Sequence, residues 1–413
     1  MTSPATIQRP MPSPARNPER PEHAYLCRAA EFLHTYGTPA HRLERLLQRA
    51  ALDLGVEAAF HSTPTSLLVS FGRGADEQTR LLRVEPGEVN LGKLIEFDEV
   101  MEDVDDGRLD LDGALARFET IAAAPPRHPR WLAGLASGVA SASAARLFAG
   151  GLAEVLLAGA LGVGIFGLGR LLGQRTRVEG VFEPLAAFSG ALAALLAARL
   201  VDVDFRVATL AGLIILVPGL TLTVSMIELA TRHLVSGVAR LAGAGTTFLT
   251  ILLGVALAWR LGGSDAPTAS VAPLPAWTAW LALLSAPPAF AILFEARVRE
   301  FGVILATGIA GFVAARVGVG ALGSDLAAFL GALVVGLASN LYARLADRPA
   351  SVPLMPGILL LVPGSLGYRS LTSFLEREAM AGMDWAFQMG LVAVSLVGGL
   401  LAANVVLPPR RSL

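Results

Sequence analysis

The fold is decided by a stretch that occurs twice, as Leu216-Val217-Pro218-Gly219-Leu220-Thr221-Leu222-Thr223-Val224-Ser225 and as Leu361-Val362-Pro363-Gly364-Ser365-Leu366-Gly367-Tyr368-Arg369-Ser370. Each copy places Val-Pro-Gly inside a long apolar run, with hydroxyl residues soon after it. Proline removes a backbone donor and clashes with the preceding helical turn, and glycine weakens the helix further. Within a bilayer such a break is tolerated only where the freed backbone is buried in protein or lines a watery cavity. We therefore predict two broken membrane helices that face one site.

The composition is that of a polytopic membrane protein. Of the 413 residues, 54% are hydrophobic and only 16% are charged, and the mean hydropathy is +0.58. The net charge of -1 gives no indication of a nucleic-acid partner. Cys27 is the only cysteine and the histidines are scattered, so we expect no disulfide framework, no metal and no cofactor.

The N-terminal region differs from the rest of the chain. Residues 1–23 are rich in Pro, Arg and Ser, and we expect them to be a disordered tail. They contain no apolar segment of a signal peptide. Residues 24–126 predict a cytoplasmic α+β domain, with a second helix that starts after a Thr38-Pro39 cap. Strands are expected at 66–71 and 79–84, and Asn90 and Asp112 are expected to cap two further helices.

Beyond the basic linker at 125–130, ten apolar spans follow, each near the length of a bilayer-crossing helix. Their expected limits are 132–149, 152–172, 181–199, 206–227, 241–261, 276–294, 301–318, 323–341, 352–374 and 385–406. Arginines are more frequent in the segments on the side of the N-terminal domain, which places that domain and both termini in the cytoplasm by the positive-inside rule.

The positions of the two breaks indicate an internal repeat. Val-Pro-Gly falls in the fourth span and again in the ninth, an offset of five spans. Because five is odd, the two units have opposite orientations in the membrane. The predicted fold is a polytopic α-helical membrane protein with ten transmembrane helices, arranged as two inverted five-helix repeats at 127–262 and 263–413. Inverted repeats with paired broken helices are typical of secondary transporters.

The chemistry of such a break suits an amino acid. The half-helix that starts after Pro-Gly offers free N–H groups and a positive dipole end to a carboxylate, and the preceding half-helix offers carbonyls to an ammonium group. The candidate substrate-binding residues are Pro218, Gly219, Thr221, Thr223, Pro363, Gly364, Ser365 and Tyr368. The alternative is that Pro-Gly only kinks each helix, while the hydroxyls bond to carbonyls of the preceding turn.

Several motifs resemble the threonine/serine exporter family. In the N-terminal domain these are Gly37-Thr38-Pro39-Ala40-His41-Arg42-Leu43-Glu44, the segment Thr63-Pro64-Thr65-Ser66, and Val89-Asn90-Leu91-Gly92-Lys93-Leu94. In the membrane part they are the two Pro-Gly stretches, with Pro356-Gly357-Ile358 before the second. The resemblance covers residues 24–406. It implies ten spans in the cytoplasmic (cell inner) membrane and export of threonine or serine driven by the proton gradient. Within this soluble-domain motif, Arg42, Thr63, Pro64, Thr65 and Ser66 are candidate site residues, and a turn leading into a strand is the other interpretation of residues 63–66.

The source of energy is less clearly marked. The sequence has no Gly-x-x-x-x-Gly-Lys-Ser/Thr loop, which argues against ATP-driven transport by this chain. A proton carrier needs a titratable group within the membrane, and the candidates are Glu154, Glu228 and Asp325. Arg146 is expected to neutralise Glu154. Each carboxylate has the alternative role of an interfacial charge.

Two other functions stay open at this point. A passive channel for small metabolites would have the same architecture. A membrane-anchored enzyme would have its chemistry in residues 24–126, at His61, Thr63 and Ser66, although no nucleophile-base-acid set is evident. The expected partners are a small amino acid, a coupling ion and the lipid bilayer, and a homo-oligomer is left open.

The topology can be tested by cysteine labelling. We expect the loops near Gln174, Arg297 and Ala346 to be cytoplasmic and those near Ser264 and Arg377 to face outward. In a background without Cys27, a Ser264→Cys variant should react with an impermeant maleimide added from outside. Failure at that position, together with labelling of Gln174→Cys, would invert the predicted topology.

Overall fold

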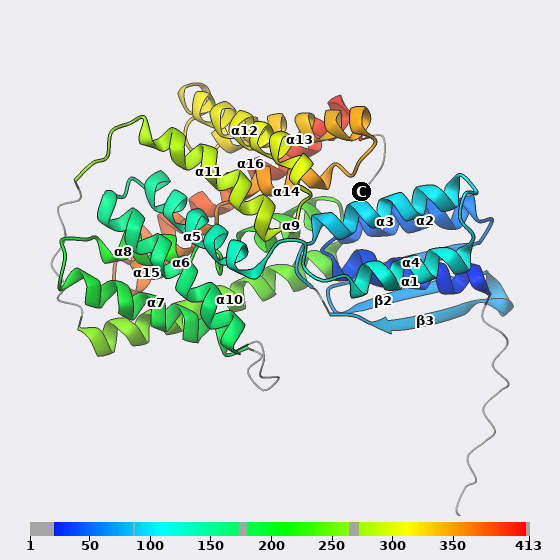
Figure 1. Cartoon of the computed structure of the whole chain (residues 1–413), viewed down its shortest axis with the longest axis horizontal. Helices are drawn as coiled ribbons and strands as arrows, with labels where there is room; N and C mark the ends of the chain where they lie inside the picture. Colours follow the sequence, from blue (N-terminus) through cyan, green and yellow to red (C-terminus); the bar gives the residue numbers. More distant parts are fainter. Residues whose placement is uncertain (1–19, 86, 173–179, 264–271, 410–413) are drawn as a thin grey trace, which may run out of the picture.

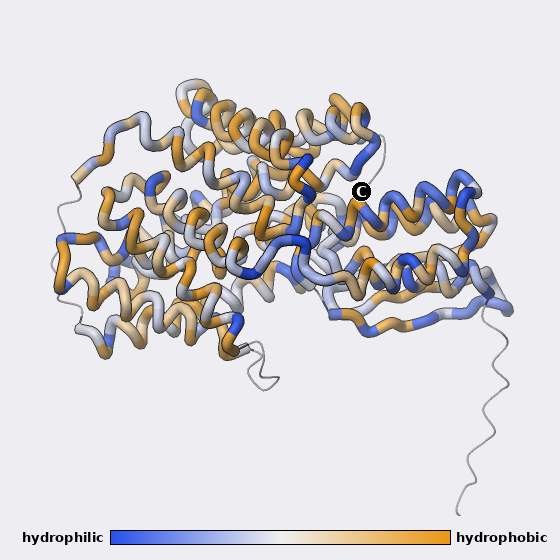
Figure 2. Tube along the Cα trace, viewed as in Figure 1, coloured by the Kyte–Doolittle hydropathy of each residue, from blue (hydrophilic) through white to orange (hydrophobic). Residues whose placement is uncertain are grey.

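The computed structural model describes residues 20–85, 87–172, 180–263 and 272–409. The protein is mostly helical, with one small sheet near the N-terminus. The N-terminal domain lies at one end of the long axis and the apolar helices fill the other end (Figure 1). Hydrophobic residues run along the helices of this bundle, whereas hydrophilic residues are frequent in the N-terminal domain (Figure 2).

The N-terminal domain packs four helices against a three-stranded antiparallel sheet of order β1-β2-β3. Its elements are α1 (Pro21–Thr35), α2 (Ala40–Asp53), β1 (Ala58–Thr63), β2 (Ser66–Phe71), η1 (Gly74–Asp76), β3 (Gln78–Arg83), α3 (Leu91–Asp105) and α4 (Leu111–Ala123). Buried aromatic rings of α1, α3 and α4 stack on one another: Tyr25, Phe32, Phe97 and Phe118. Burial of these large rings is a main source of the stability of the domain.

Most of the elements expected in this domain are present. The strand at 66–71 coincides with β2, and β3 begins one residue before its expected start. Asn90 caps α3, as predicted, by accepting a bond from the Lys93 amide. The cap of α4 is Asp110, so the prediction of Asp112 was wrong by two positions. β1 was not predicted.

The remaining helices are largely apolar. They are α5 (Arg130–Leu147), α6 (Leu152–Leu172), α7 (Phe182–Ala198), α8 (Phe205–Gly212), α9 (Gly219–Ala230), α10 (Leu234–Gly262), α11 (Thr278–Leu293), the short η2 (Val298–Glu300), α12 (Phe301–Leu322), α13 (Ala327–Ala346), α14 (Ser351–Leu359), α15 (Gly364–Leu375) and α16 (Ala379–Val406). Within the described residues, six helical segments are long and apolar enough to cross a membrane, and α7, α9 and α11 are shorter apolar helices. The expected fourth span is divided into α8 and α9, and the ninth into α14 and α15, at the predicted Pro-Gly positions.

The contacts at the two ends of the bundle show in which direction the broken helices run. Near the N-terminal domain, Glu228 of α9 accepts a bond from the Ala40 amide, and Val352 of α14 packs in the core of that domain. At the far end, Arg206 of α8 pairs with Glu376, just after α15, at 2.7 Å. The α8–α9 pair therefore runs toward the N-terminal domain, and the α14–α15 pair runs away from it.

The same element pairs contact each other in the two halves of the bundle. In the first half, α7 packs on α10, α6 on α8 and α9 on α10. The corresponding pairs of the second half are α13 on α16, α12 on α14 and α15 on α16. Other contacts cross between the halves, among them α5 with α11, α9 with α16 and α15 with α10. The second piece of each broken helix therefore packs mainly on its own half and also touches the opposite half. Of the loops expected to be cytoplasmic, those at Arg297 and Ala346 lie beside the N-terminal domain, while Gln174 and Ser264 fall outside the described residues.

Candidate functional site

Each Pro-Gly break leaves amide groups without a regular helical bond. In α9 the first bond of the i to i−4 type runs from the Leu222 amide to the Pro218 carbonyl at 2.9 Å. In α15 the first bonds run from the amides of Leu366 and Gly367 to the Pro363 carbonyl, at 3.0 and 3.2 Å. The one or two backbone amides that follow the first glycine of each helix therefore come before its first regular helical hydrogen bond. Such N–H groups at a helix start favour an anion.

The two breaks lie directly against each other. A Cβ atom placed on Gly364 would lie 3.2 Å from the Gly219 Cα and 2.6 Å from a methyl carbon of Val217. A Cβ on Gly219 would lie 3.6 Å from the Gly364 Cα and would also meet the Val362 side chain. Each glycine thus faces the other glycine and the valine that precedes the other Pro-Gly. Only a residue without a side chain allows this approach.

The meeting point lies near the middle of the bundle. Along the first broken helix, Gly219 falls between Arg206 at the far end and Glu228 beside the N-terminal domain. At about 1.5 Å per residue, Gly219 is roughly 13 Å of helix from Glu228. Along the second, Gly364 falls between Val352 and Glu376 in the same way. Both predicted breaks are therefore brought together near the middle of the length of the bundle.

The hydroxyl groups near the breaks differ in their partners. Thr223 donates to the Gly219 carbonyl at 3.1 Å and Ser225 to the Leu222 carbonyl at 2.7 Å, which is the local bonding of the alternative interpretation. Thr221 and Ser365 are half-buried. Tyr368 is buried, and its hydroxyl has no hydrogen-bond partner among the described residues. A buried hydroxyl without a partner is costly, so Tyr368 is the best placed of the hydroxyls to meet a polar ligand.

Two of the three candidate carboxylates lie far from the breaks. Glu154 is buried at the start of α6, where it accepts from the Gly151 amide at 2.8 Å and from the Asp204 amide at 2.7 Å. Asp325 lies between α12 and α13, where it accepts from the Ser324 hydroxyl. Both positions fit a structural or interfacial charge.

Arg146 does not neutralise Glu154, contrary to our expectation. Its Nε donates to the Thr278 hydroxyl at 2.6 Å, and its guanidinium also donates to the Pro275 carbonyl at 3.2 Å. It therefore joins the end of α5 to the start of α11. The two backbone amides that Glu154 accepts from already satisfy its carboxylate, so it has no need of the arginine.

Glu228 lies at the junction between the bundle and the N-terminal domain. It is fully buried and accepts from the Ser236 hydroxyl at 2.8 Å and from the Arg240 Nε at 3.1 Å. It also accepts from the amide of Ala40, the first residue of α2, at 2.9 Å. The N-cap residue Pro39 has no side-chain cap, so the expected Thr38 cap is replaced by a carboxylate of the bundle. The local sequence does not indicate this contact, because Thr38-Pro39 by itself predicts an ordinary cap.

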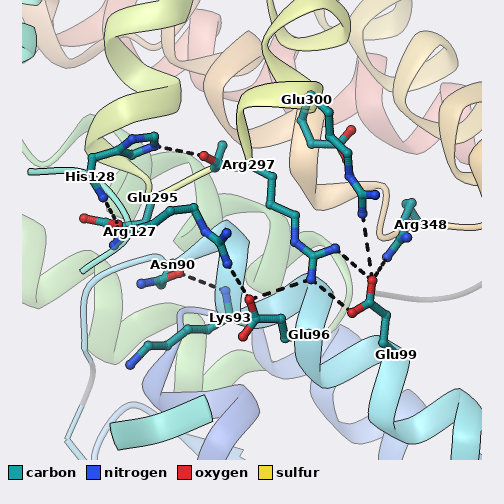
Figure 3. A network of polar contacts seen from close by, with 12 residues as sticks. Asn90, Lys93, Glu96, Glu99, Arg127, His128, Glu295, Arg297, Glu300 and Arg348 are labelled. Carbon is teal, nitrogen blue, oxygen red and sulfur yellow. Dashed lines mark hydrogen bonds and ion pairs between the residues drawn. The ribbon is translucent and has the colours of Figure 1, made fainter. Parts of the chain in front are cut away.

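The N-terminal domain is also attached to the other half of the bundle, through α3 (Figure 3). Glu99 forms a two-point ion pair with Arg297, at 2.8 and 3.0 Å, and also pairs with Arg348. These arginines hold the pKa of Glu99 down to about 2. Nearby, Glu96 pairs with Arg127, and the Leu91 amide donates to the Phe294 carbonyl at 2.8 Å. The domain therefore contacts the loops before α12 and α14 as well as the end of α9.

The other motif of the N-terminal domain forms a tight turn. Thr63 ends β1 and Ser66 begins β2, with Pro64 and Thr65 at the turn between them. The Thr63 hydroxyl bonds to the Ser66 hydroxyl at 2.7 Å and accepts from the Ser66 amide at 3.1 Å. This geometry matches the interpretation of these residues as a turn that leads into a strand. Arg42, in the first turn of α2, is half-buried near the Glu228 junction.

Together, the long apolar helices, their paired breaks and the docked N-terminal domain define a multi-pass membrane protein. A family model described as "Putative threonine/serine exporter" matches residues 24–262, and one described as "Threonine/Serine exporter, ThrE" matches residues 278–406. The chain therefore belongs to the threonine/serine exporter family, and the resemblance inferred from its motifs is confirmed. No group of three or more His, Cys, Asp or Glu residues in the described part of the chain is arranged to hold a metal ion.

Fungal membrane proteins are also similar to the chain. A "Pheromone-regulated membrane protein 10" of Eremothecium gossypii is 26% identical over 84% of this chain and 49% of its own length. A protein of the same name from Saccharomyces cerevisiae is 25% identical over 94% of this chain and 54% of its own length. The uncharacterized protein C7D4.12c of Schizosaccharomyces pombe is 26% identical over 94% and 55%. The chain thus spans about half the length of these relatives. No solved structure matches it.

The contact between the breaks predicts the effect of a side chain at either glycine. Gly219→Val or Gly364→Val should abolish transport while membrane insertion is retained, because the added methyl groups enter space occupied by the opposite break. Overpacking of this kind costs about 1–3 kcal/mol. Gly243→Val in α10 is the control, since a Cβ there meets nothing within 4 Å. Normal transport by both break variants, at wild-type membrane levels, would show that the close approach is dispensable.

The Glu99 ion pairs predict a pH dependence of domain docking. Because the pKa of Glu99 is lowered from 4.5 to about 2, its pairs stabilise the folded protein above pH 4.5 and lose this effect as the pH falls toward 2. Glu99→Gln should lower the free energy of unfolding at neutral pH by about 1 kcal/mol, the scale of partly exposed pairs. In thermal melts, the difference in stability between this variant and the wild type should become smaller as the pH is lowered. Asp112→Asn removes an exposed charge on α4 and is the control. An equal loss of unfolding free energy in that variant would show that Glu99 has no specific part in holding the domain to the bundle.

Proposed function

We propose that this protein is a secondary-active exporter of small hydroxy amino acids, threonine and serine, working as a proton antiporter. In this proposal its membrane part has ten spans, arranged as two inverted five-helix repeats, in the cell inner membrane with both termini in the cytoplasm. Membership of the exporter family supports a transporter rather than an enzyme. The opposite directions of the α8–α9 and α14–α15 pairs support the inverted arrangement.

The observation that carries the proposal is the contact between the two breaks. It brings the starts of α9 and α15 together near the middle of the length of the bundle, with Gly219 beside Gly364. Secondary transporters bind substrate at such a place, between repeats, where half-helix starts face the anionic group of the substrate. One helix start would hold the substrate carboxylate. The Tyr368 hydroxyl, buried without a partner among the described residues, would bond to the hydroxyl that distinguishes threonine and serine.

Among the carboxylates, Glu228 is the proposed coupling residue. It is buried and lies on α9 itself, nine residues after Gly219, whereas Glu154 on α6 and Asp325 in the turn before α13 lie at the far end of the bundle. Its partners include the neighbouring cation Arg240 and the first amide of α2. A change in its protonation would alter both the position of α9 and the docking of the N-terminal domain. This arrangement supports a role of that domain as a gate over the inner mouth.

Uptake into inside-out vesicles tests the proposal. With an imposed pH gradient, labelled threonine and serine should accumulate in vesicles that contain the protein, and counterflow should occur. A passive channel would equilibrate the label without counterflow, and a membrane-anchored enzyme would show neither. Glu228→Gln should abolish the response to the pH gradient while exchange of substrate continues.

The hydroxyl residues of the breaks predict a change in affinity. Thr221→Ala and Ser365→Ala should each weaken the apparent affinity for threonine by roughly 1–3 kcal/mol, the scale of a buried polar group left unpaired. Thr246→Ala is the control, because Thr246 is exposed on α10 and bonds to its own helix at Ala242. Wild-type affinity in both variants would mean that the breaks are structural kinks and that substrate binds elsewhere.

A further inference from the structure

The junction between α2 and the start of α10 collects ionisable side chains from both parts of the protein. α2 contributes His41, Arg42, Glu44 and Arg45, and the bundle contributes Glu228, His233 and Arg240. The rings of His41 and His233 lie 6.1 Å apart. This cluster lies between the N-terminal domain and the end of the broken helix α8–α9.

The acidic members of the cluster already have partners. Glu228 accepts from Ser236, Arg240 and the Ala40 amide, as described above. Glu44 accepts from the Ser62 amide at 2.7 Å and faces His233 at 3.3 Å. Neither carboxylate therefore serves as a counter-ion for the basic residues at the start of α2.

The basic members on α2 lack such partners. Arg42 is half-buried, and its guanidinium forms no hydrogen bond or ion pair with any described residue. The Nδ1 atom of His41 is buried, and no acceptor or donor among the described residues reaches it. A cation withdrawn from water without a counter-ion is costly, and a buried ring nitrogen without a hydrogen bond adds to that cost.

The electrostatic surroundings agree with a site for an anion. Burial, reinforced by Arg45, lowers the pKa of Arg42 to about 10. Burial also lowers the pKa of His41 to about 3, and the charges that lower it further, those of Arg42, His233 and Arg45, are all positive. Positive charge is therefore concentrated around the buried Nδ1 atom of His41, next to the guanidinium of Arg42.

We propose that Arg42 and His41 form a loading site, on the N-terminal domain, for the carboxylate of a small amino acid. The planar guanidinium fork matches a carboxylate at two points, and His41 donates a third bond in its Nδ1–H tautomer. The site lies at the Glu228 end of α9, roughly 13 Å of helix from Gly219, so a carboxylate bound there is held at the inner end of the path to the breaks. The assignment of the ligand as an amino acid rests on the proposed transport function.

Ligand-dependent melting of the full-length protein in lipid nanodiscs tests the site without measuring transport. The probes are L-threonine, L-serine, other small amino acids, threoninamide, which lacks the carboxylate, and inorganic phosphate at equal ionic strength. L-Threonine should stabilise the wild type, and threoninamide should not. Arg42→Gln should weaken threonine binding by roughly tenfold or more, the loss expected for a charge-assisted pair, and Arg42→Lys should weaken it less.

Arg49→Gln provides the matched control, because Arg49 is exposed on the same helix. It should bind threonine like the wild type. If Arg42→Gln does not fold, His41→Ala takes its place, with the same expected direction. Undiminished threonine binding by these variants, or equal Arg42-dependent stabilisation by threoninamide or phosphate, would overturn the proposal. If a different amino acid, and not threonine or serine, stabilises the protein and this effect requires Arg42, the carboxylate site is supported. The same result would overturn the proposal that threonine and serine are the substrates.

Discussion

A bilayer has no water to satisfy a broken helix, and the rest of this structure follows from how that constraint is met. Each Pro-Gly break frees backbone groups in the middle of an apolar bundle. The protein places one break against the other, with Gly219 facing Gly364. The second half of each broken helix also touches the opposite half of the bundle, through the α9–α16 and α15–α10 contacts. The polar backbone is thus shielded from lipid by the protein itself.

Much of the fold could be predicted from sequence because its signals are local. Apolar run length and Pro-Gly position locate the helices and their breaks, and Asn90 is recognisable as a cap from its neighbours alone. The features that were not predicted correctly depend on residues far away in the sequence. β1, with the sequence Ala-Ala-Phe-His-Ser-Thr, has few β-branched residues and is formed by pairing with β2. The partner of Arg146 lies at Thr278, and the cap of α2 comes from Glu228, so neither is visible in the adjacent sequence.

The candidate site likewise combines features that local sequence predicts with features that depend on distant residues. The glycines and prolines of the breaks were predictable, because their backbone effect is intrinsic to the residue type. The different states of the nearby hydroxyls were not, since Thr223 bonds to its own helix while Tyr368 is left without a partner among the described residues. The arginines that the positive-inside pattern assigns to the cytoplasm also have a second role that composition does not reveal. Arg297 and Arg348 pair with Glu99 and thereby hold the N-terminal domain.

The carboxylate cap on α2 has a consequence for the order in which the protein is assembled during synthesis. Ala40 and Glu228 are 188 residues apart, and Glu99 is separated from Arg348 by 249 residues. The ribosome makes the N-terminal domain first, and its docking partners follow in stages: Glu228 with α9, Arg297 before α12 and Arg348 before α14. Until then α2 carries an uncapped start and α3 an uncompensated acidic face. The finished arrangement of the domain is therefore a late event in biogenesis, coupled to insertion of the bundle.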